Sequence, residues 1–146
     1  MFKHILIPTD GSSVAAKAIQ AGIALAKEMG AKVTGFCAEE SPVRPYRNGF
    51  AVPPEIAVEL KRRWHEYAER NVAEIEKAAK AAGVAFETLV VTSDRPYQAI
   101  IDAASERKCD VICMGSHGHR GFAGLVLGSV TNQVLTHSSI PVVVLR

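Results

Sequence analysis

Residues 3–13 read KHILIPTDGSS, in which an apolar run passes through a turn into residues that can begin a helix. The run ILI, ended by Pro8, is typical of a strand that is buried on both faces. Ser12 or Ser13 can cap the helix, whose small and apolar residues keep to one face until Gly30 ends it. The stretch therefore predicts a strand, a tight turn and a helix in immediate succession.

The next segment, AKVTGFCA at 31–38, is rich in β-branched and aromatic residues and predicts a second strand. A strand, a helix and a strand in this order imply parallel pairing through a right-handed crossover. The same alternation continues along the chain. It predicts five strands, at 3–8, 31–38, 85–91, 109–115 and 141–146, with the later helices at about 55–82, 96–107 and 129–137.

Strands that are apolar throughout and alternate with helices indicate a mostly parallel sheet that is covered on both faces. We therefore predict an α/β fold of the Rossmann-like or flavodoxin-like kind, with a five-stranded parallel open sheet, helices on both faces and the strand order 3-2-1-4-5. The length suits one domain over residues 1–146. Ligands of such sheets bind beyond the carboxyl ends of the strands, where the winding direction reverses.

The composition excludes several classes of partner. The 17 basic and 15 acidic residues are interspersed and give a formal charge of +2, which predicts binding neither to nucleic acid nor to a membrane. No stretch is long and apolar enough for a membrane span, and the N-terminus does not resemble a signal peptide. Cys37, Cys109 and Cys113 lie in apolar stretches and predict buried, reduced thiols rather than a zinc or redox site. We expect a soluble, cytoplasmic protein.

The segment MGSHGHRGFAGLVLGSVTNQVL, residues 114–135, carries the chemistry. It contains neither GKS nor GKT, and no GxGxxG follows the first strand, so neither standard phosphate motif fits. The spacing Gly115-x2-Gly118-x9-Gly128-Ser129 instead predicts an anion-binding cradle made of two backbone pieces. We expect Gly115 and Gly118 to adopt positive φ and let the main chain approach a ligand.

The second backbone piece of this cradle is a helix start. Ser129, Val130 and Thr131 offer backbone N–H groups that lack intrahelical acceptors, and two of them add hydroxyl donors. The intervening residues 119–127, with several apolar side chains, are expected to wrap the phosphates of a ligand.

In combination these motifs resemble the ATP-binding branch of the universal stress protein family. The resemblance covers the whole chain and rests on five stretches: KHILIPTDGS at 3–12, MG at 29–30, MGS at 114–116, LGSV at 127–130 and HSSIPV at 137–142. It implies a nucleotide site in which the base and ribose are surrounded by Pro8, Thr9, Asp10 and Ala38. Under the ribose lie Met114 and Gly115. The phosphates are held by Gly118, Gly128, Ser129, Val130 and Thr131, with His117 beside them.

His117 departs from the family pattern, because ATP binders of this family often have arginine there. A neutral histidine offers less to a γ-phosphate, and Arg120 is the candidate substitute. His117 and His119 also form an H-x-H pair, but no Cys, Asp or Glu nearby in sequence completes a metal site. We expect no dedicated metal, only Mg²⁺ that arrives with the nucleotide; Asp10 either faces that ion or caps the turn into the first helix.

The predicted function is binding of ATP, ADP or AMP by a regulatory stress-response protein with at most slow hydrolysis. The glycine-rich segment has no lysine, and no residue clearly orients a nucleophile, so we predict no catalytic residue. Two alternatives stay open: an interaction domain of the same fold that binds no nucleotide, and a true ATPase or nucleotidyl transferase.

Two further expectations concern surfaces. The apolar terminal strand 141–146 lacks a gatekeeping charge until its last residue and predicts a homodimer, as the family resemblance also implies. The proline-rich segment 41–54 is interpreted either as a lid over the base or as a surface insertion.

Overall fold

A computed structural model of the chain describes residues 1–41, 52–119 and 127–146. Arg120 therefore lies outside the described residues, as do residues 42–51 of the predicted segment 41–54. The stretch 119–127, which is expected to wrap a ligand, lies outside them at residues 120–126. The elements in chain order are β1 (His4–Pro8), α1 (Ser13–Met29), β2 (Lys32–Glu39), α2 (Pro54–Ala82), β3 (Phe86–Thr92), α3 (Pro96–Glu106), β4 (Val111–Gly115), α4 (Ser129–His137) and β5 (Val142–Leu145).

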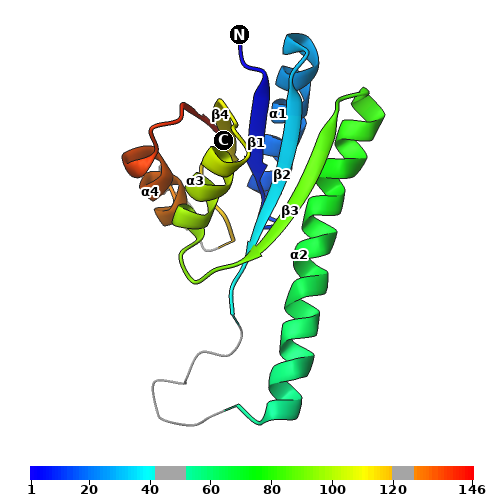
Figure 1. The fold of residues 1–146 in the computed structure, drawn as a ribbon, viewed down its shortest axis with the longest axis vertical. Helices are drawn as coiled ribbons and strands as arrows, with labels where there is room; N and C mark the ends of the chain where they lie inside the picture. Colours follow the sequence, from blue (N-terminus) through cyan, green and yellow to red (C-terminus); the bar gives the residue numbers. More distant parts are fainter. Residues whose placement is uncertain (42–51, 120–126) are drawn as a thin grey trace.

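The strands form one parallel sheet in the order β3-β2-β1-β4-β5, which confirms the predicted fold class and strand order (Figure 1). In the register of the central strand, Ile5 lies opposite Val33 of β2 and Val111 of β4. The chain winds outward from β1 to one side and then returns to the other side through β4. The switch point of the fold is therefore the gap between the carboxyl ends of β1 and β4.

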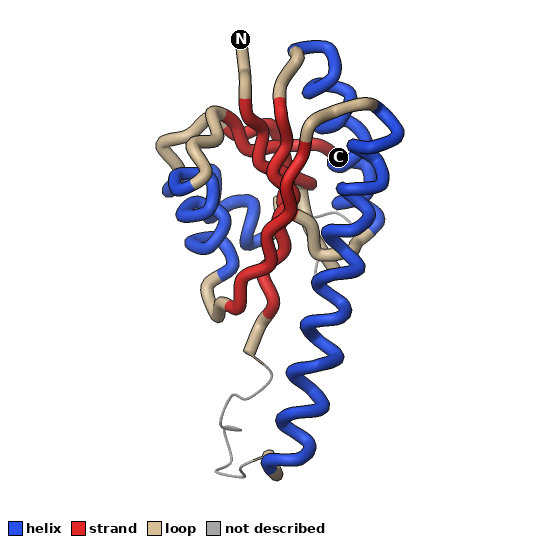
Figure 2. The backbone as a smooth tube through the Cα atoms, turned by 45° about the vertical axis from the view of Figure 1, so that its right-hand side comes forward, coloured by secondary structure: helices blue, strands red, loops and turns tan. Residues whose placement is uncertain are grey.

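Helices cover both faces of the sheet, as the blue, red and blue layers of Figure 2 show, and an apolar core lies on each face. Ile5 and Ile7 point to the core beneath α1 and α2, whereas Leu6 points to the core beneath α3 and α4. All five residues of β1 are buried, because period-2 alternation sends its side chains into one core or the other. Because β1 is packed on both faces, it fixes the position of Pro8 and of the turn that follows.

Local signals set the ends of the helices. The Ser12 hydroxyl accepts the Ala15 N–H at 3.1 Å and caps α1, while Gly30 and Gly83 end α1 and α2 in the left-handed conformation. The first half of α2 runs past the carboxyl ends of the strands, which brings this helix over the edge of the sheet (Figures 1 and 2).

Cys37, Cys109 and Cys113 are all buried and free, as predicted. Within the described part of the chain, no helix combines the length and the apolar character that a membrane span requires.

Candidate nucleotide site

The predicted site residues meet at the carboxyl edge of the sheet. Pro8 ends β1, and the Thr9 N–H then donates to the Phe36 carbonyl of β2 at 2.8 Å. On the other side of the switch point, Gly115 ends β4 and the Ser116 N–H donates to the Leu145 carbonyl of β5 at 2.7 Å. The turn after β1 and the segment after β4 are therefore both fixed by ladder-type hydrogen bonds to neighbouring strands.

The start of α4 is tied directly to the end of β4. The Gly128 N–H donates to the Ser116 carbonyl at 2.7 Å, and the Thr131 hydroxyl donates to the Gly115 carbonyl at 2.9 Å. The first intrahelical bond of α4 runs from the Asn132 N–H to the Gly128 carbonyl, so the N–H groups of residues 129–131 have no acceptor within the helix. Ser129 is exposed, which leaves this positively polarised helix end accessible to an anion.

The Thr131 hydroxyl has a different role from the predicted one. Thr131 is 3% exposed and its hydroxyl is committed to the Gly115 carbonyl, so it is not a free donor for a phosphate. The backbone N–H of this residue, like those of Ser129 and Val130, has no acceptor within the helix. The hydroxyl acts on the shape of the site, since it holds α4 against β4.

The glycines of the segment serve close packing rather than unusual dihedral angles. Among the described glycines, positive φ occurs at Gly11, Gly30 and Gly83, so the expectation of positive φ at Gly115 and Gly118 is wrong. A Cβ on Gly118 would lie 2.0 Å from the Asp10 Oδ2, and one on Gly115 would lie 2.9 Å from a methyl carbon of Val14. The absent side chains let two loops and a helix approach one another.

Gly128 has the same role on the other side of the cradle. A Cβ there would lie 3.0 Å from the backbone Cα of His117. The segment that follows β4 and the start of α4 thus touch at a position where a Cβ would force the His117 backbone to shift by a few tenths of an ångström. This contact and the hydrogen bond from the Gly128 N–H to the Ser116 carbonyl hold the two predicted backbone pieces against each other.

Asp10 joins the turn after β1 to the glycine-rich segment. Its Oδ1 accepts the Ser12 N–H at 3.0 Å, and its Oδ2 accepts the His119 N–H at 3.0 Å. The carboxylate therefore orders the turn into α1, as one of the two interpretations predicts, and it also contacts the glycine-rich segment.

Residues of α2 complete the site, and the sequence did not identify them. The Tyr67 hydroxyl donates to the Asp10 carbonyl oxygen at 3.0 Å, and the His119 Nε2 lies 2.8 Å from the same oxygen. Asn71 packs on the turn as well, because a Cβ on Gly11 would lie 2.5 Å from its Oδ1. Tyr67 fell on the apolar periodicity of the helix, and that signal does not distinguish a core residue from one that reaches a distant turn.

The remaining predicted residues differ from one another in how deeply they are buried. Met114 is buried in the core beneath α3 and α4, and Ala38 borders the same core with partial exposure. His117 is half-buried, with its Nδ1 3.0 Å from the Ser116 hydroxyl. Among the residues that the structure describes, no three His, Cys, Asp or Glu side chains are placed to hold a metal ion. His117 and His119 are therefore not part of such a group there.

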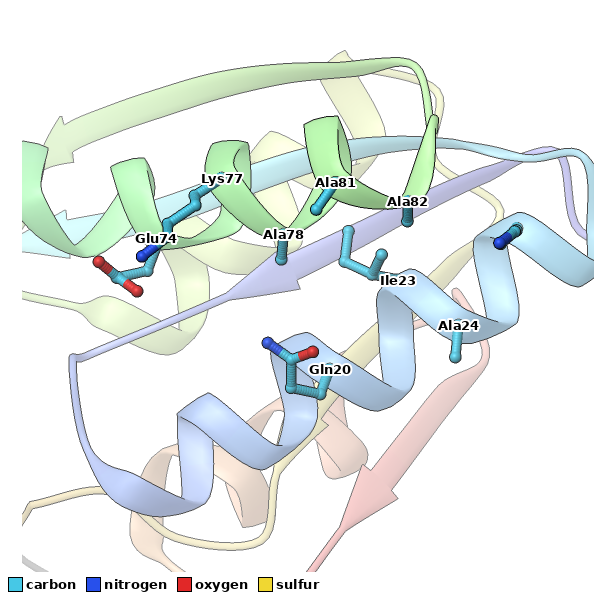
Figure 3. A pocket seen from close by; sticks show the side chains of 9 residues that line it. Gln20, Ile23, Ala24, Glu74, Lys77, Ala78, Ala81 and Ala82 are labelled. Atoms are coloured by element: carbon cyan, nitrogen blue, oxygen red, sulfur yellow. The ribbon is translucent and has the colours of Figure 1, made fainter.

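Two cavities lie on the α1 and α2 face. A groove of about 490 Å³ runs between the two helices, lined among others by Gln20, Ile23, Glu74 and Ala78 (Figure 3). A smaller hollow of about 130 Å³ shares Gln20 and Glu74 with it and reaches Thr9, Gly11 and Ser12. The large groove lies along the bodies of the helices, whereas the backbone donors suited to an anion lie at the strand ends.

The fold is an open α/β domain in which the start of α4 meets the end of β4 at the topological switch point. The sequence model of the universal stress protein family matches residues 1–146, and the chain belongs to this family. It is 36% identical over 146 residues to a universal stress protein of Thermus aquaticus, with both chains covered fully.

Solved structures agree with this membership. The chain is similar to the protein MJ0577 of Methanocaldococcus jannaschii, with a TM-score of 0.83, 28% identity and coverage of 99% of this chain and 96% of that one. It also shares the fold of a universal stress protein solved in complex with cAMP, with a TM-score of 0.70, 24% identity and coverage of 99% and 97%.

Proposed function

We propose that this protein binds an adenine nucleotide, ATP or one of its lower phosphates, at the carboxyl edge between β1 and β4. The observation that carries the proposal is the hydrogen bond of 2.7 Å from Gly128 to Ser116, which holds the start of α4 against the end of β4. It aligns the N–H groups of residues 129–131 beside a strand end, where a phosphate gains backbone donors and the positive end of the helix dipole.

Each predicted residue has a place in this proposal. The phosphates bind to the backbone at Gly118, Gly128, Ser129, Val130 and Thr131, with His117 beside them. The ribose lies over Met114 and Gly115, and the base and ribose are flanked by Pro8, Thr9, Asp10 and Ala38. Support for an adenine ligand comes from the similar protein solved with cAMP and from others of the same fold solved with dAMP and with AMP.

Magnesium suits this site as a companion of the nucleotide. The Asp10 carboxylate lies within hydrogen-bonding distance of the His119 N–H, so it faces the region where we place the phosphates. Like charges at such a distance repel, and a divalent cation carried by the phosphates offsets that repulsion. We therefore propose that a triphosphate or diphosphate binds as its magnesium complex.

The same geometry favours a binder over a catalyst. Catalysed phosphoryl transfer requires cations at the γ-phosphate and a residue that orients the nucleophile. The glycine-rich segment 114–135 contains no lysine, and Asp10 already accepts two backbone N–H groups. We place the protein among regulatory nucleotide binders with at most slow hydrolysis, in a reducing cytoplasm that suits its three free thiols.

A homodimer through β5 is part of the proposal. β5 forms one edge of the sheet, and Val142, Val143, Val144 and Leu145 are all partly exposed. An apolar edge strand that stays partly exposed favours pairing with a second copy, and a two-fold contact closes the exposed ladder.

Mass spectrometry of small molecules released from the purified, denatured protein tests the proposed ligand. We expect an adenine nucleotide, or, if the protein purifies empty, a thermal shift on addition of millimolar ATP, ADP or AMP with magnesium. A protein that carries no nucleotide and shows no shift with any of the three contradicts the proposal and favours the interaction domain.

A further inference from the structure

The main-chain carbonyl of Asp10 is the meeting point of three segments that are far apart in sequence. It belongs to the turn after β1, and it accepts a hydrogen bond from Tyr67 of α2 and one from the ring of His119 in the glycine-rich segment. The Tyr67 hydroxyl and the His119 Nε2 are themselves 3.0 Å apart. These two side chains, which we call the Tyr67–His119 bridge, close a ring of contacts with the carbonyl.

The chemistry of the three atoms fixes the hydrogens. A carbonyl oxygen only accepts, so the His119 Nε2, at 2.8 Å from it, must carry a hydrogen. The Tyr67 hydroxyl donates its own hydrogen to the same carbonyl oxygen at 3.0 Å. The Tyr67 oxygen can then act only as an acceptor of a hydrogen bond. A carbonyl has two lone pairs, so the Asp10 oxygen accommodates both donors.

The bridge is not explained by core packing. Tyr67 is 40% exposed and His119 is also exposed, so neither side chain gains much from burial. What the bridge fixes is the Asp10–Gly11 peptide, against which α2 packs closely: a Cβ on Gly11 would lie 2.7 Å from the Tyr67 hydroxyl. With its backbone held, Asp10 presents its carboxylate to the N–H groups of Ser12 and His119.

We propose that Tyr67 and His119 are positioning residues of the nucleotide site, which makes this inference rest on the proposed function. The bridge holds the glycine-rich segment against the turn after β1, so that the cradle is formed before a nucleotide arrives. A site that is already ordered does not lose that ordering entropy on binding, and its affinity is correspondingly higher. Neither side chain is required to touch the ligand.

Substitutions that remove one donor at a time test the bridge. Tyr67→Phe and His119→Ala are each expected to weaken nucleotide affinity about three- to tenfold by calorimetry, the range for the loss of one hydrogen bond. His119→Gln, whose amide nitrogen can replace Nε2 as the donor, is expected to restore affinity to within about twofold of wild type. The double variant Tyr67→Phe/His119→Ala should lose less than the product of the single effects, because both donors act on one carbonyl.

The control is Thr136→Val, which also removes a hydroxyl that donates to a backbone carbonyl, that of Asn132 at 2.8 Å, but in the last turns of α4. It should leave affinity unchanged. Wild-type affinity in both Tyr67→Phe and His119→Ala, in a protein that binds nucleotide, overturns the inference. So does a loss in His119→Gln as large as that in His119→Ala.

Amide hydrogen exchange of the nucleotide-free protein separates the bridge from the proposed function. The His119 N–H, bonded to the Asp10 Oδ2, should exchange faster in Tyr67→Phe than in wild type or Thr136→Val, whether or not the protein binds a nucleotide. An unchanged exchange rate overturns the bridge. Absence of binding by wild type, with faster exchange in Tyr67→Phe, overturns the proposed function alone.

Discussion

The Thr131 hydroxyl donates a hydrogen bond of 2.9 Å to the carbonyl oxygen of Gly115, which joins the first turn of α4 to the last residue of β4. Both groups are buried, with Thr131 3% exposed. Because this bond and the neighbouring bond from Gly128 to Ser116 are the described links between the two backbone pieces, they determine how the N–H groups of α4 face the strand ends.

Thr131→Val removes this hydroxyl while keeping the shape of the side chain. The buried Gly115 carbonyl loses its side-chain donor, and we expect the free energy of unfolding to fall by about 1–3 kcal/mol. Urea denaturation measures the change. Thr136→Val, at an exposed position, should change stability by less than about 0.5 kcal/mol. Equal effects in the two variants would contradict the role assigned to Thr131.

Gly118→Ala places a Cβ where the Asp10 Oδ2 now lies, 2.0 Å away. One of the two must move, so the hydrogen bond from the His119 N–H to this carboxylate should break and nucleotide affinity should fall at least several-fold. The matched experiment is the same substitution in an Asp10→Ala background. There the methyl group has room, and Gly118→Ala should cost little further affinity; a full additional loss would show that Asp10 is not the obstacle.

The three thiols should be unreactive in the folded protein. Burial raises the pKa of Cys37, Cys109 and Cys113 to about 11 each, so the thiolate is scarce at neutral pH. A chromogenic disulfide reagent at pH 8 should modify none of them within minutes in native protein and all three in denaturant. Rapid modification of one cysteine before unfolding would show an exposed thiol and exclude this picture of the core.

His4 gives the folded protein a pH dependence of known sign. Burial, followed by the charge of Lys32, lowers the pKa of His4 below its ordinary 6.5, and its Nε2 contacts the Thr34 hydroxyl at 2.7 Å. Below about pH 6.5 the unfolded chain therefore takes up a proton that the folded chain resists. The stability that this residue contributes is present above that pH and is lost as the pH falls.

The measurement is urea denaturation of wild type and His4→Gln between pH 7.5 and 5. Glutamine keeps a donor near Thr34 but does not titrate, so wild type should lose more stability than the variant on acidification. A gap between the two that stays constant across this range would contradict the lowered pKa.

The edge strand β5 offers a directional test of the proposed dimer. The carbonyls of Pro141 and Leu145 accept from β4, so by the alternation of a parallel ladder the N–H groups of Val142 and Val144 face outward. Val144→Pro removes an outward donor and should convert a dimer to a monomer in light scattering. Val143→Pro removes an inward donor and should mainly destabilise the fold. A wild-type protein that is monomeric at micromolar concentration would exclude the dimer.

The sequence predicted the fold well because strands that are buried on both faces and helices that end at glycine leave clear local patterns. Gly30 and Gly83 illustrate this, since each ends a helix in the left-handed conformation that glycine favours. The same alternation and the handedness of crossovers predict a parallel sheet, but they do not distinguish the order 3-2-1-4-5 from other doubly wound orders. Only the boundaries moved, by one or two residues at most ends.

The site was harder to predict because its contacts join residues that are distant in sequence. Gly118 was singled out for a positive φ, whereas the structure shows the close approach of Asp10, more than a hundred residues earlier. Tyr67 and Asn71 carry no local signal, because a residue that reaches across to a turn has the same helical spacing as one that packs in the core. The hydroxyl of Thr131 looked free because its acceptor, Gly115, belongs to another element.

The central claim is that the start of α4 and the end of β4 together hold the phosphates of an adenine nucleotide. Isothermal titration calorimetry of the purified, nucleotide-stripped protein with magnesium-ATP, ADP and AMP tests it most directly. We predict saturable binding of one nucleotide per chain, abolished by Gly128→Val, whose side chain collides with the backbone of His117. No binding of any of the three at millimolar concentration, or undiminished binding by a folded Gly128→Val variant, would contradict the claim.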